Sequence, residues 1–393
     1  MRVVALGGAG AMGRRAIRFI SDNPKVESIV VADLNEDAAK AFAAEVGFKA
    51  SARKVDIGDI PAMDRLLGGA DVVLNFVGPY YKHGATVLQA AIRNRIHYMD
   101  INDDWEPTLD MLEFDDQARA AGIIAVIGMG ASPGLSNLLA SAAVRQLDRV
   151  DTLHICMNMD AADVDDSDVP DPHLDASYIN AAAVHSMQQM ASDVRIRRDG
   201  KFVDTPAWAK VEFKDMGVAV SSGRILGHPE PLTLPRTFPT IQNSAALMLA
   251  NESDAALADE LVAKVRSGEM SREDGARVLV QAVGERPPTV LSPAGDAERG
   301  LAPVVMAYAA GEKDGKTRHV ALRVSSLPGP GMAKLTSIPL GVALGLLIDG
   351  KITRRGVCSA EGAIDPDDFF AALAPHTYPP RKNRDDLIVC TII

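Results

Sequence analysis

The sequence predicts an α/β protein in which an open, mostly parallel sheet is joined to a second domain. Short apolar runs alternate with amphipathic stretches over the first third of the 393-residue chain, and after Gly134 a strand-like, turn-rich pattern replaces this alternation. Strands separated by helices pair in parallel through right-handed crossovers. The chain is also longer than one hydrophobic core usually supports, so two domains are expected.

The elements of the first third alternate between strand and helix along the chain. The predicted strands are Arg2–Leu6, Ser28–Ala32, Asp71–Phe76, His97–Ile101 and Ile123–Ile127, and the predicted helices are Ala11–Asn23, Glu36–Val46 and Ala85–Arg93. The last strand is apolar throughout, which is typical of a strand buried on both faces.

The middle of the chain is expected to mix strands and helices, and the C-terminal part to return to helix–strand alternation. A helix at Leu135–Leu147 is followed by a strand at Asp151–Met159 and an acidic loop at Asp160–Asp171. The region from Arg195 to Pro239 is strand-like, with a hairpin turn at 198–201. Two helices are predicted within Ser253–Gly284, and a second hairpin joins Val304–Ala309 to Thr317–Val324. Beyond a Gly- and Pro-rich hinge at 326–331, a helix through Leu340–Leu347, a strand at Gly356–Cys358 and a helix at Asp367–Leu373 are expected. We therefore expect residues 1–131 to form the first domain, 132–328 the second, and 329–393 to return to the first.

Composition and charge exclude several classes of protein. The chain has 41 Lys and Arg against 52 Asp and Glu, a net charge of -11, so it lacks the basic footprint of a nucleic-acid-binding protein. Its longest apolar stretch, Ile338–Ile348, contains a proline and is too short to span a bilayer. Cys156, Cys358 and Cys390 have no metal-ligand spacing, and no HExxH motif is present, so no metal is expected. A cytoplasmic protein is predicted, and the apolar tail Leu387–Ile393 suits an edge strand or the interface of a homodimer.

The strongest motif lies directly after the first strand and opens the first helix. Its glycines are Gly8, Gly10 and Gly13, with Ala11 and Met12 between the last two. In this context the first glycine permits a tight turn, the second lets the backbone approach a pyrophosphate, and the third lets helix and strand pack closely. The helix N-terminus then offers N–H groups and partial positive charge to the phosphates. The motif predicts a dinucleotide site.

Asp33 supplies the acid that such a site needs at the end of the second strand. It lies 20 positions after Gly13, where its carboxylate can accept hydrogen bonds from the adenosine ribose. No arginine follows it at once, so NAD is favoured as the cofactor. NADP is not excluded, since Arg14 and Arg53 can approach the same place.

With these residues in place, the chain resembles the saccharopine dehydrogenase-like family, which includes saccharopine reductases, lysine 6-dehydrogenases and carboxynorspermidine dehydrogenases. Besides the glycine loop, the similar passages are Asp71-Val-Val-Leu-Asn-Phe-Val-Gly-Pro-Tyr80, His97-Tyr-Met-Asp100, the Pro-Gly loop within 128–137, and a C-terminal pattern of Gly350, Gly356-Val357 and Glu361. The resemblance implies a doubly wound Rossmann domain completed by C-terminal elements, with an α+β domain inserted. It also implies reversible hydride transfer at a carbon–nitrogen bond of an amino acid, opine or polyamine derivative.

Candidate catalytic residues follow the third and fourth predicted strands. His83 can serve as the acid–base, with Tyr80 or Lys82 as a hydrogen-bonding partner, and Asp100 can steady a substrate ammonium or a catalytic side chain. A purely structural role, in capping or packing, is the alternative for each. Asn75, Val77 and Gly78 are expected to join the cofactor site.

The second domain is expected to supply substrate contacts. Ser132, Pro133 and Gly134 open a helix whose N–H groups can hold a substrate carboxylate, unless they form a plain domain-crossing turn. His228 can face the substrate, although a His-x-Glu in a Pro-rich stretch is more often a surface turn. The acidic run Asp163–Asp168 is expected to be a solvated loop.

Two other functions remain open at this point. The same fold can reduce a carbonyl or enoyl group, in which case the cleft would be apolar rather than lined by arginines such as Arg236. A non-catalytic NAD-binding sensor is the third possibility, because fold does not imply function.

Overall fold

The computed structural model describes residues 1–158, 181–284, 294–329 and 331–393. They form two compact units, of which the first contains Met1–Leu138 and Ala333–His376 and the second contains Leu139–Met332 and Thr377–Ile393. The chain first passes between the units inside helix α7 (Leu135–Val144).

A seven-stranded sheet in which every pairing is parallel forms the centre of the first unit. In spatial order its strands are β15 (Gly356–Ser359), β6 (Ile124–Ile127), β5 (His97–Asp100), β4 (Val72–Asn75), β1 (Arg2–Leu6), β2 (Ser28–Asp33) and β3 (Ala50–Lys54). The chain reverses direction across the sheet between β1 and β4, which is the switch point at which such sheets bind ligands. The predicted doubly wound parallel sheet is confirmed.

Helices connect these strands. They are α1 (Ala11–Ser21), α2 (Glu36–Val46), α3 (Ile60–Leu67), α4 (Tyr80–Asn94), α5 (Trp105–Leu112), α6 (Asp115–Ala121), α12 (Met332–Ile348), α13 (Ala360–Ala363) and α14 (Pro366–Leu373). Several are capped by local side chains: Asn35 accepts from the N–H of Ala38 at the start of α2, and Asp365 accepts from two N–H groups at the start of α14. Such caps satisfy N–H groups that have no acceptor inside the helix.

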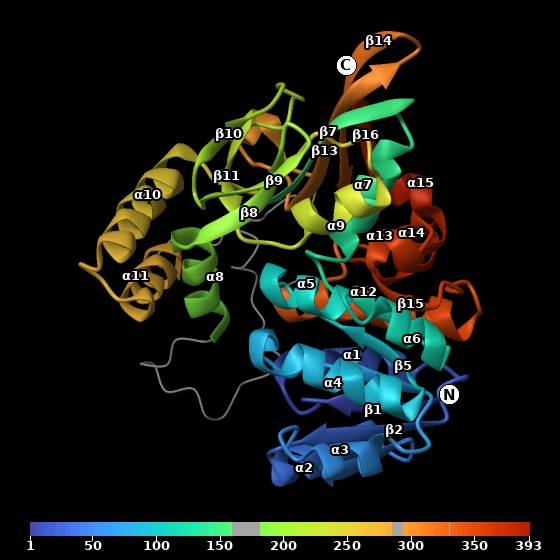
Figure 1. Ribbon diagram of the computed structural model, residues 1–393. Coiled ribbons are helices and arrows are strands. Elements are labelled where there is room, and N and C mark those ends of the chain that lie inside the picture. Colours follow the sequence, from blue (N-terminus) through green and yellow to red (C-terminus); the bar gives the residue numbers. More distant parts are fainter. Residues whose placement is uncertain (159–180, 285–293, 330) are drawn as a thin grey trace. The chain divides into compact units, whose positions relative to one another are not determined.

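Residues Ala333–His376 complete the first unit. Strand β15 pairs in parallel with β6 and lies next to helix α6 (Figure 1). On the helical side, the hydroxyl of Ser337 in α12 donates to the backbone carbonyl of Met12 in α1. Gly341 of α12 lies against Phe19, where an added Cβ would approach the ring to 2.4 Å. The two helices therefore pack closely beside the glycine loop.

A nine-stranded mixed sheet forms the second unit. Its main path runs β10 (Lys210–Glu212), β11 (Ser222–Leu226), β12 (Asn243–Leu249), β7 (Arg149–Asn158), β13 (Val305–Lys313), β14 (Lys316–Val324) and β16 (Ile388–Ile392), while β8 (Asp193–Arg198) and β9 (Lys201–Pro206) form a hairpin that joins β12. Only β12 and β7 are parallel along this path, and the two predicted hairpins, β8–β9 and β13–β14, are present.

Helices α8 (Ala181–Ala191), α10 (Glu252–Ser267) and α11 (Arg272–Gly284) pack with one face of this sheet. Met157 of β7 and Met248 of β12 share an apolar cluster with residues of these helices. The neighbouring positions Cys156 and Leu247 belong to a different cluster. Because successive side chains of a strand point to opposite faces, the second cluster lies on the other face of the sheet.

Several sequence expectations are wrong. The tail does not return with the rest of the C-terminal segment, since β16 pairs with β14 and forms an edge of the second sheet. Helix α9 (Glu230–Thr237) lies in the region expected to be strand-like, because Pro231 and Pro235 obscure its helical pattern. Strand β3 was not predicted, since its residues are mostly polar or small. The acidic run Asp163–Asp168 lies outside the described residues.

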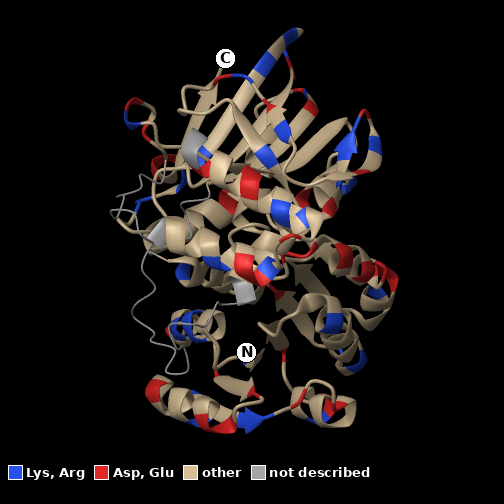
Figure 2. Ribbon diagram, turned by 90° about the vertical axis from the view of Figure 1, so that its left-hand side faces the viewer, with Lys and Arg blue, Asp and Glu red and all other residues tan. Residues whose placement is uncertain are grey.

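Charged residues of both signs are interspersed along the ribbon of both units (Figure 2). Among the described residues, no helix combines the length and apolar character that crossing a membrane requires.

Candidate functional site

The glycine loop is held against the end of β2. The backbone N–H groups of Gly7 and Gly8 both donate to the carbonyl of Ala32, at 2.8 and 3.2 Å. Gly7 has a φ of +69°, a conformation that residues with a Cβ rarely adopt. These bonds fix the turn that leads from β1 into α1.

Two glycines of the motif have different surroundings. A Cβ on Gly13 would lie 2.6 Å from the carbonyl oxygen of Gly7 and 2.7 Å from the Cα of Gly8, so helix and loop are in direct backbone contact there. A Cβ on Gly10 would meet only the Gly7 oxygen, at 3.4 Å, and otherwise open space. Gly13 is thus needed for packing, whereas the open side of Gly10 leaves room for a ligand to approach the backbone.

The N-terminus of α1 is arranged to receive an anion. Gly10 is its N-cap, with no side-chain cap, and the first turn contains no acidic residue. The N–H groups of Ala11 and Met12 have no acceptor inside the helix, and the helix dipole adds partial positive charge. The loop and this helix end fit the pyrophosphate of a dinucleotide.

Asp33 lies beside the loop, as predicted. One carboxylate oxygen accepts from the N–H of Ala9 at 3.1 Å, and the other accepts from the N–H of Asn35 at 3.0 Å. Arg14 also contacts Ala9, since its Nε donates to the Ala9 carbonyl at 2.7 Å. The Arg14 guanidinium also lies 4.7 Å from the centre of the Phe42 ring, so protein groups already engage it.

A buried hydrogen-bond network joins the ends of β4 and β5. The Nδ2 of Asn75 donates to the hydroxyl of Tyr98 at 3.2 Å, and that hydroxyl donates to Asp100 at 2.7 Å. The side-chain oxygen of Asn75 accepts from the N–H of Val77, and its backbone carbonyl accepts from the hydroxyl of Tyr80. The network therefore fixes the loop that contains the predicted cofactor contacts Asn75, Val77 and Gly78.

Asp100 is fully buried at the centre of this network. Besides Tyr98, it accepts hydrogen bonds from the N–H groups of Gly128, at 2.6 Å, and Asn102, at 3.1 Å. These donors are neutral, and burial raises the pKa of Asp100 from 3.8 to about 6. Both oxygens serve the protein itself, which favours positioning of the loops over direct contact with a substrate.

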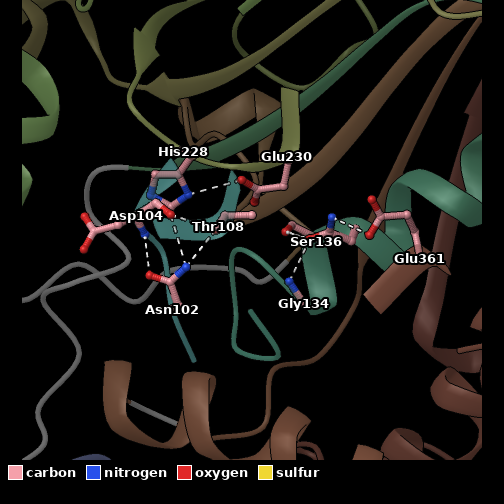
Figure 3. Close-up of polar contacts among 9 residues, drawn as sticks. Asn102, Asp104, Thr108, Gly134, Ser136, His228, Glu230 and Glu361 are labelled. Carbon is pink, nitrogen blue, oxygen red and sulfur yellow. Dashed lines mark hydrogen bonds and ion pairs between the residues drawn. The ribbon is translucent and has the colours of Figure 1, made fainter. Parts of the chain in front are cut away.

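A second cluster extends the network beyond β5. The Nδ2 of Asn102 donates to the carbonyl of Asp104 and to the hydroxyl of Thr108, at 3.1 and 2.7 Å (Figure 3). Asn102 is fully buried, so these contacts order the segment between β5 and α5. No family pattern in the sequence accounts for the run Asn102-Asp103-Asp104, and the structure makes Asn102 a structural anchor.

Tyr80 and His83 lie in the first turn of α4 and not in the loop that the sequence predicts, because the helix begins at Tyr80. Tyr80 is buried. Its pKa is raised well above the ordinary value, mainly by burial and secondly by the negative charge of the nearby Asp100 carboxylate. His83 is half-buried. Their predicted catalytic roles stay predictions.

The Pro-Gly loop is closed by its own hydrogen bonds. The N–H groups of Leu135 and Ser136 donate to the carbonyls of Gly130 and Ala131, and the N–H of Gly134 donates to the side chain of Asn137 at 2.8 Å. Asn137 in turn donates to Glu361 at 2.8 Å (Figure 3). The N–H groups predicted to hold a substrate carboxylate thus have acceptors within the first unit, which favours the turn over the carboxylate site. The substrate-binding roles of Ser132, Pro133 and Gly134 stay predictions.

His228 and Glu230 lie in the second unit. They are almost completely buried, and the Nδ1 of His228 is 3.3 Å from a carboxylate oxygen of Glu230 (Figure 3). The surface turn considered for this pair is therefore wrong, because both side chains are buried and Glu230 begins α9. Arg236, near the other end of α9, is exposed.

The first unit thus brings the cofactor-loop residues together with the network around Asp100. Sequence reasoning missed Tyr98, Asn102 and Asn137 as parts of this arrangement. The sequence contains a signal for Tyr98, since it belongs to the family-like passage His97-Tyr-Met-Asp100. The role of Asn137 instead depends on Glu361, a partner far away in the sequence.

Comparisons with known proteins agree with this geometry. Residues 3–126 match the family model described as the saccharopine dehydrogenase NADP-binding domain. Along nearly its whole length the chain is 22% identical to a carboxyaminopropylagmatine dehydrogenase from Synechocystis sp., covering 96% of this chain and 97% of that protein. The predicted resemblance to the saccharopine dehydrogenase-like family and the dinucleotide cofactor are confirmed.

Solved structures share the fold over the full chain. The apo saccharopine dehydrogenase (L-Glu forming) from Saccharomyces cerevisiae has a TM-score of 0.63 at 14% identity, covering 100% of this chain and 99% of that one. The homospermidine synthase from Legionella pneumophila, solved with NAD, has a TM-score of 0.60 at 11% identity, covering 95% of this chain and 89% of that one.

Proposed function

We propose that this saccharopine dehydrogenase-like chain is an NAD(P)-dependent oxidoreductase that transfers hydride reversibly at a carbon–nitrogen bond of an amino-acid, opine or polyamine derivative. The observation that carries the proposal is the glycine loop, open at Gly10 and followed by an uncapped helix N-terminus. The alignment with a carboxyaminopropylagmatine dehydrogenase over nearly both whole chains supports a polyamine-type substrate.

In the reductive direction, a primary amine and an aldehyde lose water to form a C=N bond. The cofactor supplies the hydride, one proton is added at nitrogen, and the product is a secondary amine together with the oxidised dinucleotide. The protein must therefore position the C=N carbon and deliver a proton. His83 is the candidate for that proton, and Tyr80 and Asp100 hold the loop after β4 in place.

The surroundings of Asp33 favour NAD over NADP. A 2′-phosphate would lie close to the Asp33 carboxylate and be repelled by it. Arg14 would have to leave the Ala9 carbonyl and the Phe42 ring to compensate for that charge.

The test is a pair of fluorescence titrations with NADH and NADPH, followed by an absorbance assay of hydride transfer. The substrate panel combines diamines, guanidino amines and amino acids with short carboxyl-bearing aldehydes. Oxidation of NADH that requires both an amine and an aldehyde supports the proposal. Turnover of a carbonyl or enoyl compound alone would favour the alternative reductase. Tight cofactor binding without any turnover would favour a sensor.

We also propose that the protein works in the cytoplasm as a homodimer. Cys156, Cys358 and Cys390 are free thiols, which suits a reducing compartment. Strand β16 is an edge of the second sheet, and Ile392 and Ile393 are exposed there. Light scattering after size exclusion measures the mass directly, and a monomeric mass would rule out the dimer.

A further inference from the structure

A pocket of about 360 Å³ lies on the second unit's sheet, among residues that no step of the proposed reaction uses. Its floor consists of small residues in adjacent strands: Ala245 of β12, and Thr152 and Ala310 of β7 and β13. His154 and Tyr308 pair across β7 and β13, and His319 of β14 pairs with Ala310. The β8 residues Arg197 and Arg198 and the β10 residue Glu212 also line the pocket (β7, β8, β10 and β13 are labelled in Figure 1).

The pocket opens on the face of the sheet opposite helices α8, α10 and α11. Tyr308 and Ala245 belong to the apolar cluster of that face, together with Cys156. Cys156 and Met157 are consecutive, and Met157 packs with the three helices. The two faces therefore have separate cores, and the pocket belongs to the face without those helices.

His154 places a hydrogen-bond donor in this pocket. Its side chain is only 6% exposed, and its Nδ1 accepts from the backbone N–H of Ala245 at 3.1 Å. The proton of the neutral ring therefore resides on Nε2. Burial lowers the pKa of His154 to about 4, so the ring is neutral at physiological pH. Within the described part of the chain, Nε2 has no hydrogen-bond partner.

Tyr308 fixes the orientation of the second imidazole that lines the pocket, that of His319. Its ring is stacked on His154, with centres 6.0 Å apart and planes 11° from parallel. Its hydroxyl lies 2.7 Å from the Nδ1 of His319 and accepts from the N–H of Lys214. The 2.7 Å contact therefore fixes the orientation of the His319 ring.

The charged groups at the rim are mainly positive. The Nε of Arg197 donates to the carbonyl of Ile241, and its guanidinium lies 5.2 Å from the centre of the Phe202 ring. Arg198 is exposed and can reach a ligand. The one carboxylate lining the pocket, that of Glu212, is 3.2 Å from Lys210. The lining thus offers N–H donors and positive charge, which are the groups that bind oxygen anions.

We propose that this pocket is a binding site for a small oxyanion, the carboxylate or phosphate group of a metabolite, separate from the dinucleotide loop. The guanidinium group of Arg198 binds the anion at the rim, and the Nε2–H of His154 donates to it at the base.

Calorimetric titration with inorganic phosphate, citrate and succinate at matched ionic strength tests the proposal. We expect saturable binding of at least one of the three, and a loss of affinity of tenfold or more in both Arg198→Ala and His154→Phe. The matched control is Arg195→Ala on the same strand, which removes one positive charge outside the pocket, where Arg195 is paired with Asp204. Its affinity should stay within twofold of the unmodified protein.

The outcomes also separate this site from the proposed enzyme function. An Asp33→Ala variant should bind the anion normally while losing dinucleotide affinity. Phosphate binding without citrate or succinate binding would identify a phosphate site, and the reverse a carboxylate site. If none of the three probes bound saturably, or if Arg195→Ala weakened binding as much as Arg198→Ala did, the proposal would be overturned. Arg198 is exposed, so its variant tests the pocket even if His154→Phe fails to fold.

Discussion

The side-chain amide of Asn137 donates a 2.8 Å hydrogen bond to Glu361, and this bond joins two segments of the first unit that are 224 residues apart in the sequence. Asn137 also accepts from the N–H of Gly134, so one side chain fixes the Pro-Gly loop and attaches it to the returning C-terminal segment. Both residues are buried, which makes each contact costly to lose.

Replacing Asn137 should therefore destabilise the first unit. Asn137→Ala leaves the Gly134 N–H and the Glu361 carboxylate without this partner, at a cost of about 2–3 kcal/mol in free energy of unfolding. Glu361→Gln retains an acceptor oxygen and should cost less. Urea unfolding in a Trp208→Phe background measures the effect, because Trp105 then reports on the first unit alone. Equal losses in the two variants would contradict this assignment.

Gly10 and Gly13 should respond differently to the same substitution. Gly10→Ala fits the fold, because Gly10 has a φ of -75° and open space around its added Cβ. It should leave the melting temperature nearly unchanged and weaken NADH binding tenfold or more, since the methyl group obstructs the pyrophosphate. Gly13→Ala forces two backbone segments apart and should cost about 1–3 kcal/mol of stability. Thermal unfolding and NADH fluorescence, measured on both variants, separate the two effects. Unchanged NADH affinity in Gly10→Ala would place the cofactor elsewhere.

Asp33 should decide between the two cofactors. Asp33→Ala removes the acceptor for the ribose and a contact to the N–H of Ala9, so NADH affinity should fall about tenfold or more. NADPH affinity should fall less, because repulsion of the 2′-phosphate is lost at the same time. Asp37→Ala is the matched control, since it removes an exposed carboxylate from the first turn of α2. An equal fall for both cofactors would mean that Asp33 acts only by holding the loop.

Local sequence patterns predicted the cofactor half of the first unit well. The glycine spacing, Asp33 and the apolar strands act through neighbouring residues, so their pattern suffices to place β1, α1 and β2. The Asn137–Glu361 contact depends instead on β15 pairing with β6, which no local pattern specifies. The pairing of β12 with β7 is similarly non-local.

Two other errors have different causes. The prolines of α9 suggested a surface turn around His228, although one lies at the start of the helix, where proline is tolerated. The apolar tail was expected to follow its neighbours back to the first unit. A pairing partner in the second sheet took precedence, because an apolar edge strand is stabilised by any complementary free edge.

Asp100 should make the stability of the first unit depend on pH. Since burial raises its pKa from 3.8 to about 6, the folded protein binds this proton more tightly than the unfolded chain does between those values. The contribution of Asp100 to stability is therefore greatest below about pH 4, and it falls by on the order of 3 kcal/mol as the pH rises to about 7.

Asp100→Asn removes this dependence, because an amide resembles the protonated acid: its oxygen accepts from Gly128 and Asn102, and its NH₂ donates to Tyr98. Relative to the unmodified protein, the variant should gain about 2 kcal/mol between pH 4.5 and 7.5, measured by urea unfolding through Trp105. Tyr98→Phe removes a donor to the carboxylate and should move the transition to higher pH. Parallel stability curves for Asp100→Asn and the unmodified protein would mean that the carboxylate is already ionised at pH 4.5, and that its three hydrogen bonds outweigh its burial.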